Sequence, residues 1–318
     1  MRRTKVLSIV GPGRSGTTIL ASVLGETDGV TSVGELRWLW RRGLLERRSC
    51  GCGVPPDECA VWSKVVPAAL GDIGTTPAAM AAAQDELSSR RHRIRAIRSA
   101  RGGEADWPAL ELVRTTTARV LTAVAEVTGS NVIVDSSKRA QDAAVLAALE
   151  DVDHYVIHIV RDPGAVAFSW QRADKTVRVE GGTRAMATRR LLPSVTRWLE
   201  NCASAEVLRR SVPRERWLFL RYEDFATRPR ATISRILSFL DEPTTPPFAD
   251  EDSVVLHTNH TVAGNPNRFR TGQVRIALDD EWSRRMPARR RLAVRALTWP
   301  FLLRYGYPVV GRTAKSSG

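Results

Sequence analysis

The sequence predicts an α/β fold in which a central, mostly parallel sheet is flanked by helices. Two observations indicate this: short runs rich in β-branched residues alternate with helical patterns, and the first run leads through a glycine-rich loop into a helix. The predicted strands cover residues 6–10, 30–33, 131–134, 155–160 and 217–220. Because no Gly/Ser- or Pro-rich linker and no repeat divides the chain, we expect one domain over residues 1–311 and a disordered tail at 312–318.

The loop after the first strand has the sequence GPGRSGTT over residues 11–18. Its position between a strand and a helix directs backbone N–H groups at a phosphate. Gly11 and Gly16 are spaced as in the P-loop of nucleotide triphosphatases, which predicts a P-loop-like fold, but Thr17 stands where those enzymes require lysine. We therefore predict a phosphate site that does not use the magnesium chemistry of ATP. Arg14 supplies a cation, and hydroxyl donors come from Ser15, Thr17 and Thr18.

The second predicted strand is followed by Gly34 and Glu35. A carboxylate at this edge can take a proton from an acceptor that attacks a bound phosphoryl or sulfuryl group. It can equally be an acid in the first turn of the helix predicted over residues 36–41, where it interacts favourably with the helix dipole. Both interpretations of Glu35 stay open at this point.

Three of the four cysteines, Cys50, Cys52 and Cys59, lie close together in the sequence, and Cys202 is far away. A closed zinc site needs four Cys or His ligands, and the sequence shows neither a suitable histidine spacing nor a second CxxC. We therefore expect a small loop with reduced thiols or one disulfide, and we predict no metal site.

Two helical segments are predicted between the strand units, over about residues 67–103 and 182–210. Insertions of this kind form a lid or acceptor-binding cap, or a plain helical hairpin on the surface. An arginine-rich amphipathic helix is predicted over residues 287–304.

Polar residues also follow the third and fourth strands. The third is followed by DSSK at residues 135–138, where Asp135 and Ser136 can cap a helix and Lys138 can place a charge on a departing phosphate oxygen. The fourth is followed by Arg161, and Ser169 lies roughly 9 Å along the next helix, so that both can meet one anion. A second phosphate site, separate from the glycine-rich loop, is therefore predicted.

The fifth strand is followed by RYEDF at residues 221–225. Tyr222 offers a ring and a hydroxyl for a purine, or it fills the core beside Phe225. Chemistry alone does not separate these two roles.

The net charge of +14 leaves three interpretations: a nucleic-acid surface, an anionic membrane or substrate, or an excess of arginine on solvated helices. Few aromatic residues are interleaved with the arginines, which disfavours nucleic acid. The sequence begins in a core strand without an apolar signal stretch and has no segment long enough to span a bilayer, so we expect a soluble cytoplasmic protein.

Four motifs in this order resemble those of the sulfotransferases that use 3'-phosphoadenosine 5'-phosphosulfate (PAPS). They are GPGRSGTT at 11–18, DSSK at 135–138, RDP at 161–163 with Ser169 following, and RYEDF at 221–225. The resemblance covers residues 5–307. It includes GNPNRFRT at residues 264–271, which is similar to the mobile C-terminal loop of bacterial members.

The resemblance implies a role for each matching residue. The 5'-phosphosulfate would be bound by Gly13, Arg14, Ser15, Gly16, Thr17 and Thr18, and the 3'-phosphate by Arg161 and Ser169. Tyr222 would lie by the adenine, and Arg268 or Arg270 would add charge. Glu35 matches the catalytic glutamate of the tyrosylprotein branch, and Lys138 matches a lysine that assists the leaving group. Cytosolic animal members use a histidine base, so the alternatives here are His92, His257 and His260.

These roles imply an in-line transfer to a hydroxyl or amine, with PAP, the 3',5'-bisphosphate, as product and without a metal. The acceptor could be a small molecule, lipid, glycan or peptide, and arginines in the predicted caps favour an anionic one. One alternative is a P-loop kinase or similar nucleotide-binding enzyme, which Thr17 disfavours. The other is a non-enzymatic basic protein that binds nucleic acid or another acidic polymer, which only the net charge favours.

Overall fold

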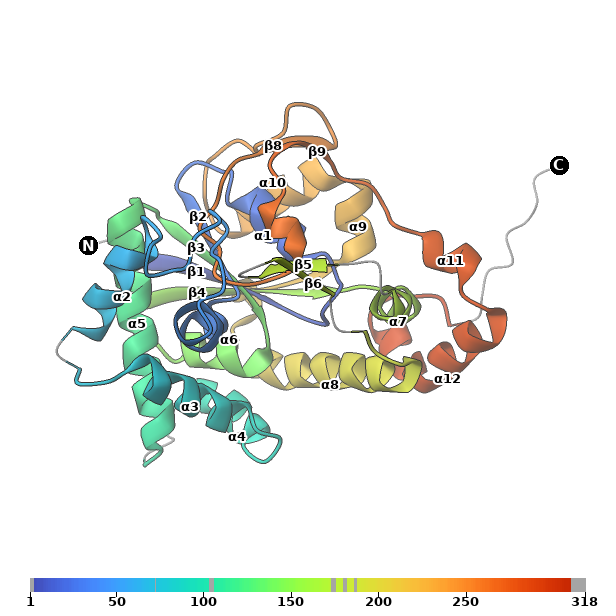
Figure 1. Ribbon diagram of the computed structural model, residues 1–318. Helices are drawn as coiled ribbons and strands as arrows, with labels where there is room; N and C mark the ends of the chain where they lie inside the picture. Colours follow the sequence, from blue (N-terminus) through green and yellow to red (C-terminus); the bar gives the residue numbers. More distant parts are fainter. Residues whose placement is uncertain are drawn as a thin grey trace.

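The structure is a computed structural model that describes residues 3–71, 73–102, 106–172, 176–179, 182–185 and 188–309 (Figure 1). The tail expected at 312–318 lies outside these residues. Every helix in the described part of the chain is too short or too polar to cross a membrane.

The centre of the molecule is a parallel sheet of five strands in the order β2-β3-β1-β4-β7. The strands are β1 Thr4–Val10, β2 Val30–Gly34, β3 Val132–Lys138, β4 Val152–Val160 and β7 Trp217–Arg221. All five strands predicted from the sequence are therefore confirmed. Because they run in one direction, their carboxyl ends share one edge of the sheet, where the predicted site residues follow.

Helices cover both faces of this sheet, which is why the strands are apolar without alternation. Val6 and Ile133 belong to a core shared with α2 Trp62–Leu70, α3 Pro77–Ser88 and α5 Pro108–Thr128. Leu7 and Ile9 point the other way, into a second core. That core includes residues of α1 Thr17–Leu24, α9 Tyr222–Thr227 and α10 Pro229–Phe239. The α/β fold class with helices on both faces is confirmed.

The remaining helices complete the covering layers seen in Figure 1. They are α4 Arg93–Arg98, α6 Ala140–Ala147, α7 Pro163–Gln171, α8 Leu191–Arg209, α11 Glu281–Arg285 and α12 Ala288–Arg304. The C-terminal helix predicted over 287–304 is thus confirmed. The segment 67–103 contains α3, α4 and the end of α2, and its Met80 and Leu87 are buried in the core with α5, so it is more than a surface hairpin.

Two local predictions differ from the structure, and one pair of strands was not predicted. The helix predicted from residue 182 begins at Leu191, and β5 Thr176–Val179 pairs with β6 Gly182–Ala185 in a hairpin before it. The helix expected at 36–41 is a 3₁₀ turn, Leu36–Trp38, followed by a π-helix, Leu39–Leu45. A second hairpin, β8 Ser253–Leu256 with β9 Gly272–Arg275, was not predicted because its strands are four residues long and far apart in the sequence.

His158 on β4 gives the fold a testable pH dependence. Its ring packs edge-on against Trp217, Phe219 and Tyr305 and is 1% exposed. Burial, together with the charges of Arg209 and Arg304, lowers the pKa of His158 to about 3. Because the unfolded histidine binds a proton below pH about 6.5, acid favours the unfolded chain between these two values.

In a His158→Phe variant, the stability lost between pH 7 and pH 5 should therefore be about 2 kcal/mol smaller than in the wild type. The comparison must be made between the two proteins, because burial raises the pKa of Asp135 to about 7 and this contributes with the opposite sign. Urea unfolding at both pH values measures the difference. If stability depended on pH identically in the two proteins, His158 would bind its proton equally well in the folded and the unfolded chain.

Candidate functional site

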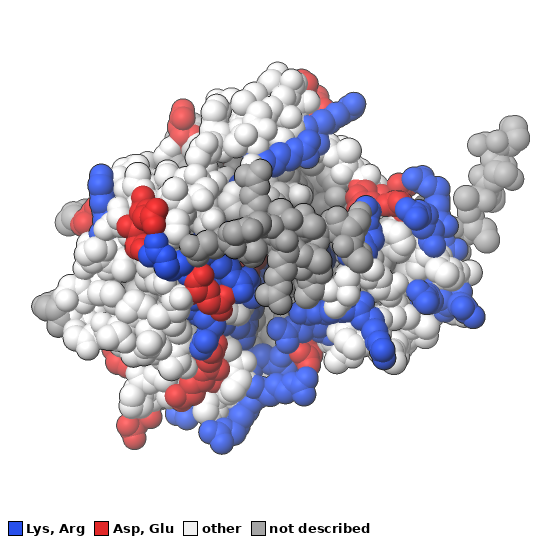
Figure 2. Space-filling model, viewed as in Figure 1, with Lys and Arg blue, Asp and Glu red and all other residues white. Residues whose placement is uncertain are grey.

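A cavity of about 560 Å³ opens at the carboxyl edge of the sheet. Its walls come from the loop after β1, the ends of β2 and β3, the segment from β4 into α7, and parts of α8, α9 and residues 264–267. The described lining contains eight basic residues, Arg14, Arg37, Arg42, Lys138, Arg139, Arg161, Arg189 and Arg197. It contains two acids, Glu35 and Asp279. On the face drawn in Figure 2, Lys and Arg also gather across the middle and the lower part. This excess of positive charge fits a ligand with several negative charges.

The glycine-rich loop forms one end of the cavity. Gly16 is the N-cap of α1 and has a positive φ of 75°. The first residues of the helix, Thr17 and Thr18, line the cavity. A Cβ atom at Gly16 would lie 2.5 Å from Cδ2 of Tyr222, whose ring is buried. The loop thus needs glycine here for two reasons, the backbone conformation and the close approach of the ring.

A Gly16→Ala variant should lose more stability than a Gly129→Ala variant. Both glycines have a positive φ, 75° and 67°, so both substitutions carry a similar backbone cost of about 1–2 kcal/mol. Among the described residues, no atom lies within 4 Å of a Cβ at Gly129, whereas Tyr222 must move in the Gly16 variant. Urea denaturation compares the two, and equal losses would mean that the Tyr222 ring shifts without cost.

Arg14 and Lys138 share an uncommon backbone conformation, each with φ of 71°. The guanidinium of Arg14 lies 4.6 Å from the ring centroid of Trp170, and that of Arg189 lies 4.2 Å from the same ring. Burial lowers the pKa of Arg14, and the charge of Arg189 lowers it further. Trp170 therefore holds two like charges at the cavity, where an anion would relieve their repulsion.

Arg161 begins the connection from β4 to α7 and lies beside the glycine-rich loop. Its Nη1 donates to the carbonyl of Arg14 at 3.3 Å, and its Nη2 forms an ion pair with Asp279 at 3.2 Å. The guanidinium stacks 4.4 Å from the ring centroid of Tyr222. Its Nε is buried and makes no hydrogen bond within the described part of the chain. Ser169, on α7, lines the same cavity.

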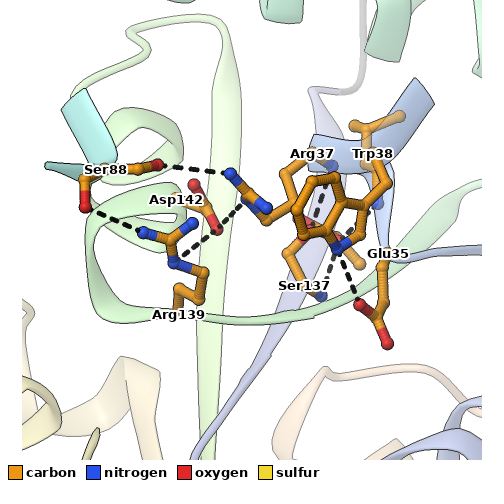
Figure 3. A network of polar contacts seen from close by, with 9 residues as sticks. Glu35, Arg37, Trp38, Ser88, Ser137, Arg139 and Asp142 are labelled. Carbon is orange, nitrogen blue, oxygen red and sulfur yellow. Dashed lines mark hydrogen bonds and ion pairs between the residues drawn. The ribbon is translucent and has the colours of Figure 1, made fainter. Parts of the chain in front are cut away.

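Glu35 and Lys138 form an ion pair at the ends of β2 and β3. Their side chains are 13% and 17% exposed, and both line the cavity. Trp38 Nε1 donates to the other carboxylate oxygen of Glu35 at 3.1 Å (Figure 3). The carboxylate is thus held between a cation and an indole at the cavity wall.

The network in Figure 3 continues behind Glu35 to residues that the sequence analysis did not select. Arg37 lies 3.8 Å from the Trp38 ring centroid and pairs with Asp142 at 3.4 Å. Arg139 lies 3.9 Å from the same Asp142 oxygen and donates to the carbonyl of Ser88, while Arg37 donates to the Ser88 hydroxyl. In the sequence these arginines are indistinguishable from solvated helix surface.

Asp135 connects two turns at this edge of the sheet. It accepts hydrogen bonds from the Ser137 amide at 2.9 Å, from the Ser137 hydroxyl at 2.6 Å and from the Leu36 amide at 3.3 Å. It therefore ties the turn after Glu35 to the turn that carries Lys138. Asp162 is the N-cap of α7 and accepts from the Gly164 amide at 2.7 Å, and burial raises its pKa to about 6.

The structure brings most of the predicted site residues together in this cavity. Those that line it are Gly13, Arg14, Gly16, Thr17, Thr18, Glu35, Lys138, Arg161, Ser169 and Tyr222. Tyr222 also packs in one core with Phe225, so the two roles considered for it coexist. Three predicted residues, Ser15, Arg268 and Arg270, are not in the lining.

The arginines of the segment 264–271 lie in different environments. Arg268 is buried, and its guanidinium donates to the carbonyls of Thr261 at 2.7 Å and Ser49 at 2.6 Å. Arg270 is exposed. In this structure Gly264, Asn265 and Asn267 of the segment line the cavity instead.

The histidines considered as bases also lie elsewhere. His92 packs edge-on against Trp107, and His257 contacts Glu26 at 2.7 Å. His260 lies 3.1 Å from Cys59 Sγ, beside Cys50 and Cys52. None of the three is among the described residues that line the cavity.

Comparisons with known proteins identify a family and solved structures to which this chain is similar. A family model described as "Sulfotransferase family" matches residues 7–246. The solved sulfotransferase domain of the Synechococcus PCC 7002 olefin synthase is 21% identical, covers 95% of this chain and 96% of its own, and has a TM-score of 0.50. Sulfotransferase STF9 from Mycobacterium avium is 16% identical, with 98% of this chain and 79% of that chain covered and a TM-score of 0.49. A search of curated proteins finds no match.

Proposed function

This chain belongs to the sulfotransferase family, and on that premise we propose that it transfers the sulfuryl group of PAPS to a hydroxyl or amine of an acceptor. One observation carries the proposal: Arg14 and Arg161 follow neighbouring strands of the sheet, contact each other and line a single cavity. Two arginines that line one cavity from adjacent strand ends suit one ligand that has a 5'-phosphosulfate and a 3'-phosphate.

The donor would be held by the chain's own cations and amides. The glycine-rich loop and Arg14 take the 5'-phosphosulfate, Arg161 and Ser169 take the 3'-phosphate, and the Tyr222 ring lies by the adenine. The eight basic residues of the cavity support this assignment because they offset the charge of such a donor where an ATP site uses magnesium.

The transfer itself would be an in-line displacement. Glu35 takes the proton of the acceptor, whose oxygen or nitrogen forms a bond to sulfur while the bond from sulfur to the 5'-phosphate oxygen breaks. Lys138 and Arg14 then stabilise the negative charge that develops on the departing phosphate. The ion pair between Lys138 and Glu35 places the proposed base beside the cation proposed for the leaving group.

The acceptor would approach from the side of Glu35. Trp38 lines the cavity there with the guanidinium groups of Arg37 and Arg42 stacked 3.8 and 3.6 Å from its ring centroid. Basic groups around an aromatic ring suit an anionic acceptor. A screen of metabolite extracts with labelled PAPS would identify it.

Calorimetry with PAP and with ATP plus magnesium tests the proposed donor. We expect PAP to bind more tightly, because only PAP places a phosphate at Arg161. Tighter binding of ATP with magnesium would instead support the kinase alternative. Salt-sensitive binding of nucleic acid that survives Arg161→Ala would support a non-enzymatic basic protein.

A further inference from the structure

Three cysteines and one histidine outside the cavity converge on one point. Cys50 and Cys52 follow the π-helix Leu39–Leu45, Cys59 precedes α2, and His260 follows β8, about 200 residues later in the chain. Their four ligand atoms, three Sγ and one imidazole nitrogen, all lie within 4.8 Å of one another. The fold thus brings a fourth ligand, His260, to three cysteines from which it is far away in the sequence.

The distances in this cluster fit a shared metal better than a disulfide. Cys50 Sγ and Cys59 Sγ are 3.7 Å apart, whereas a disulfide joins its sulfurs at about 2.05 Å. Two thiolates about 2.3 Å from one tetrahedral zinc ion lie about 3.8 Å apart. Nδ1 of His260 lies 3.1 Å from Cys59 Sγ, so it can occupy another corner.

The backbone holds the two segments of the cluster together. The Gly51 amide donates to the carbonyl of Thr261 at 2.9 Å, and Trp62 Nε1 donates to the carbonyl of His260 at 2.7 Å. A Cβ atom at Gly51 would collide with Asn259, so only glycine permits this approach. The amides of Val61 and Trp62 also donate to Cys59, as amides near metal-bound thiolates do.

We propose that Cys50, Cys52, Cys59 and His260 bind one zinc ion. Thiolate and imidazole ligands favour zinc over magnesium or calcium, and four protein ligands leave no open position for a substrate. The site is therefore structural, and it is separate from the residues proposed for sulfuryl transfer.

The zinc ion would hold one wall of the cavity. Directly after His260, the Val262 amide bonds to the carbonyl of Val33 on β2, and the Glu35 amide bonds to the carbonyl of Ala263 at 3.3 Å. The next residues, Gly264 and Asn265, line the cavity. Loss of the ion should therefore loosen the segment that supports Glu35.

Metal analysis of the full-length protein, purified with zinc in the medium and a reductant, tests the site. We expect about one zinc per chain, and a titration of the chelated protein with Co²⁺ should produce the absorption bands of tetrahedral cobalt bound to thiolates. Chelation should also lower the melting temperature, and added zinc should restore it. These readouts do not depend on enzymatic activity.

Variants with matched controls identify the ligands. Cys52→Ser and His260→Ala should each lower the zinc content well below one per chain, whereas His257→Ala, at an exposed histidine, should retain it. Cys52 and His260 are only partly buried, so these two variants are the ones expected to fold. The proposal would be overturned if the wild type bound neither zinc nor cobalt, if a Cys50–Cys59 disulfide persisted in protein purified with the reductant, or if both ligand variants retained full zinc content.

Discussion

An Arg161→Ala variant is expected to bind PAP about 100-fold more weakly than the wild type, a loss of about 3 kcal/mol. Arg161 is 6% exposed, and its charge-assisted hydrogen bonds to a phosphate would form in a site largely shielded from water. Its Nε is buried without a hydrogen bond in the described structure, which leaves a donor for the ligand. Calorimetric titration with PAP measures the change.

The matched control is Arg235→Ala. Arg235 is exposed on α10 and does not line the cavity, so its removal changes the net charge equally but should leave affinity within about twofold. Arg161→Lys should give an intermediate affinity, because lysine keeps the positive charge but lacks the planar guanidinium that can bind a phosphate through two N–H groups. Equal weakening in the Arg161→Ala and Arg235→Ala variants would mean that only overall charge attracts PAP.

A Glu35→Gln variant should lower turnover by about 10²–10⁴-fold, the usual contribution of a positioned general base, while PAP affinity changes little. The amide keeps the shape of the side chain and can still accept a hydrogen bond from Trp38, but it cannot take a proton. Before an acceptor is identified, hydrolysis of PAPS with water as acceptor gives the rate.

Glu46→Gln is the control for this result. Glu46 is exposed, pairs with Arg48 and is not part of the cavity lining. The turnover of the Glu46→Gln variant should therefore equal that of the wild type. If Glu35→Gln instead retained full turnover, a different base would be required. If it lost PAP affinity as well, Glu35 would act in positioning the donor rather than in proton transfer.

The sequence could predict the sheet and most of the cavity because these features are local. Each strand of the parallel sheet contains an apolar run, Glu35 directly follows β2, and Lys138 is the last residue of β3. A residue next to a strand end must lie at the carboxyl edge, so the topology alone brings such residues together.

Features that depend on pairs distant in the sequence could not be predicted. His260 joins the cysteines only because β8 and the following turn fold back against residues 50–59. Arg268 matched a loop motif, but its side chain turns to the carbonyls of Ser49 and Thr261, which are defined only by the tertiary structure. The ion pair between Arg37 and Asp142 likewise joins two residues that are far apart in the sequence.

The left-handed backbone at Arg14 and Lys138 limits how stable the fold can be. Glycine would adopt this conformation more easily at both positions, but it would remove these two cations from the cavity. With arginine and lysine there, the folded state is less stable than glycine would make it. Substitutions that raise heat tolerance at these two positions would therefore remove the cations proposed to stabilise the departing phosphate.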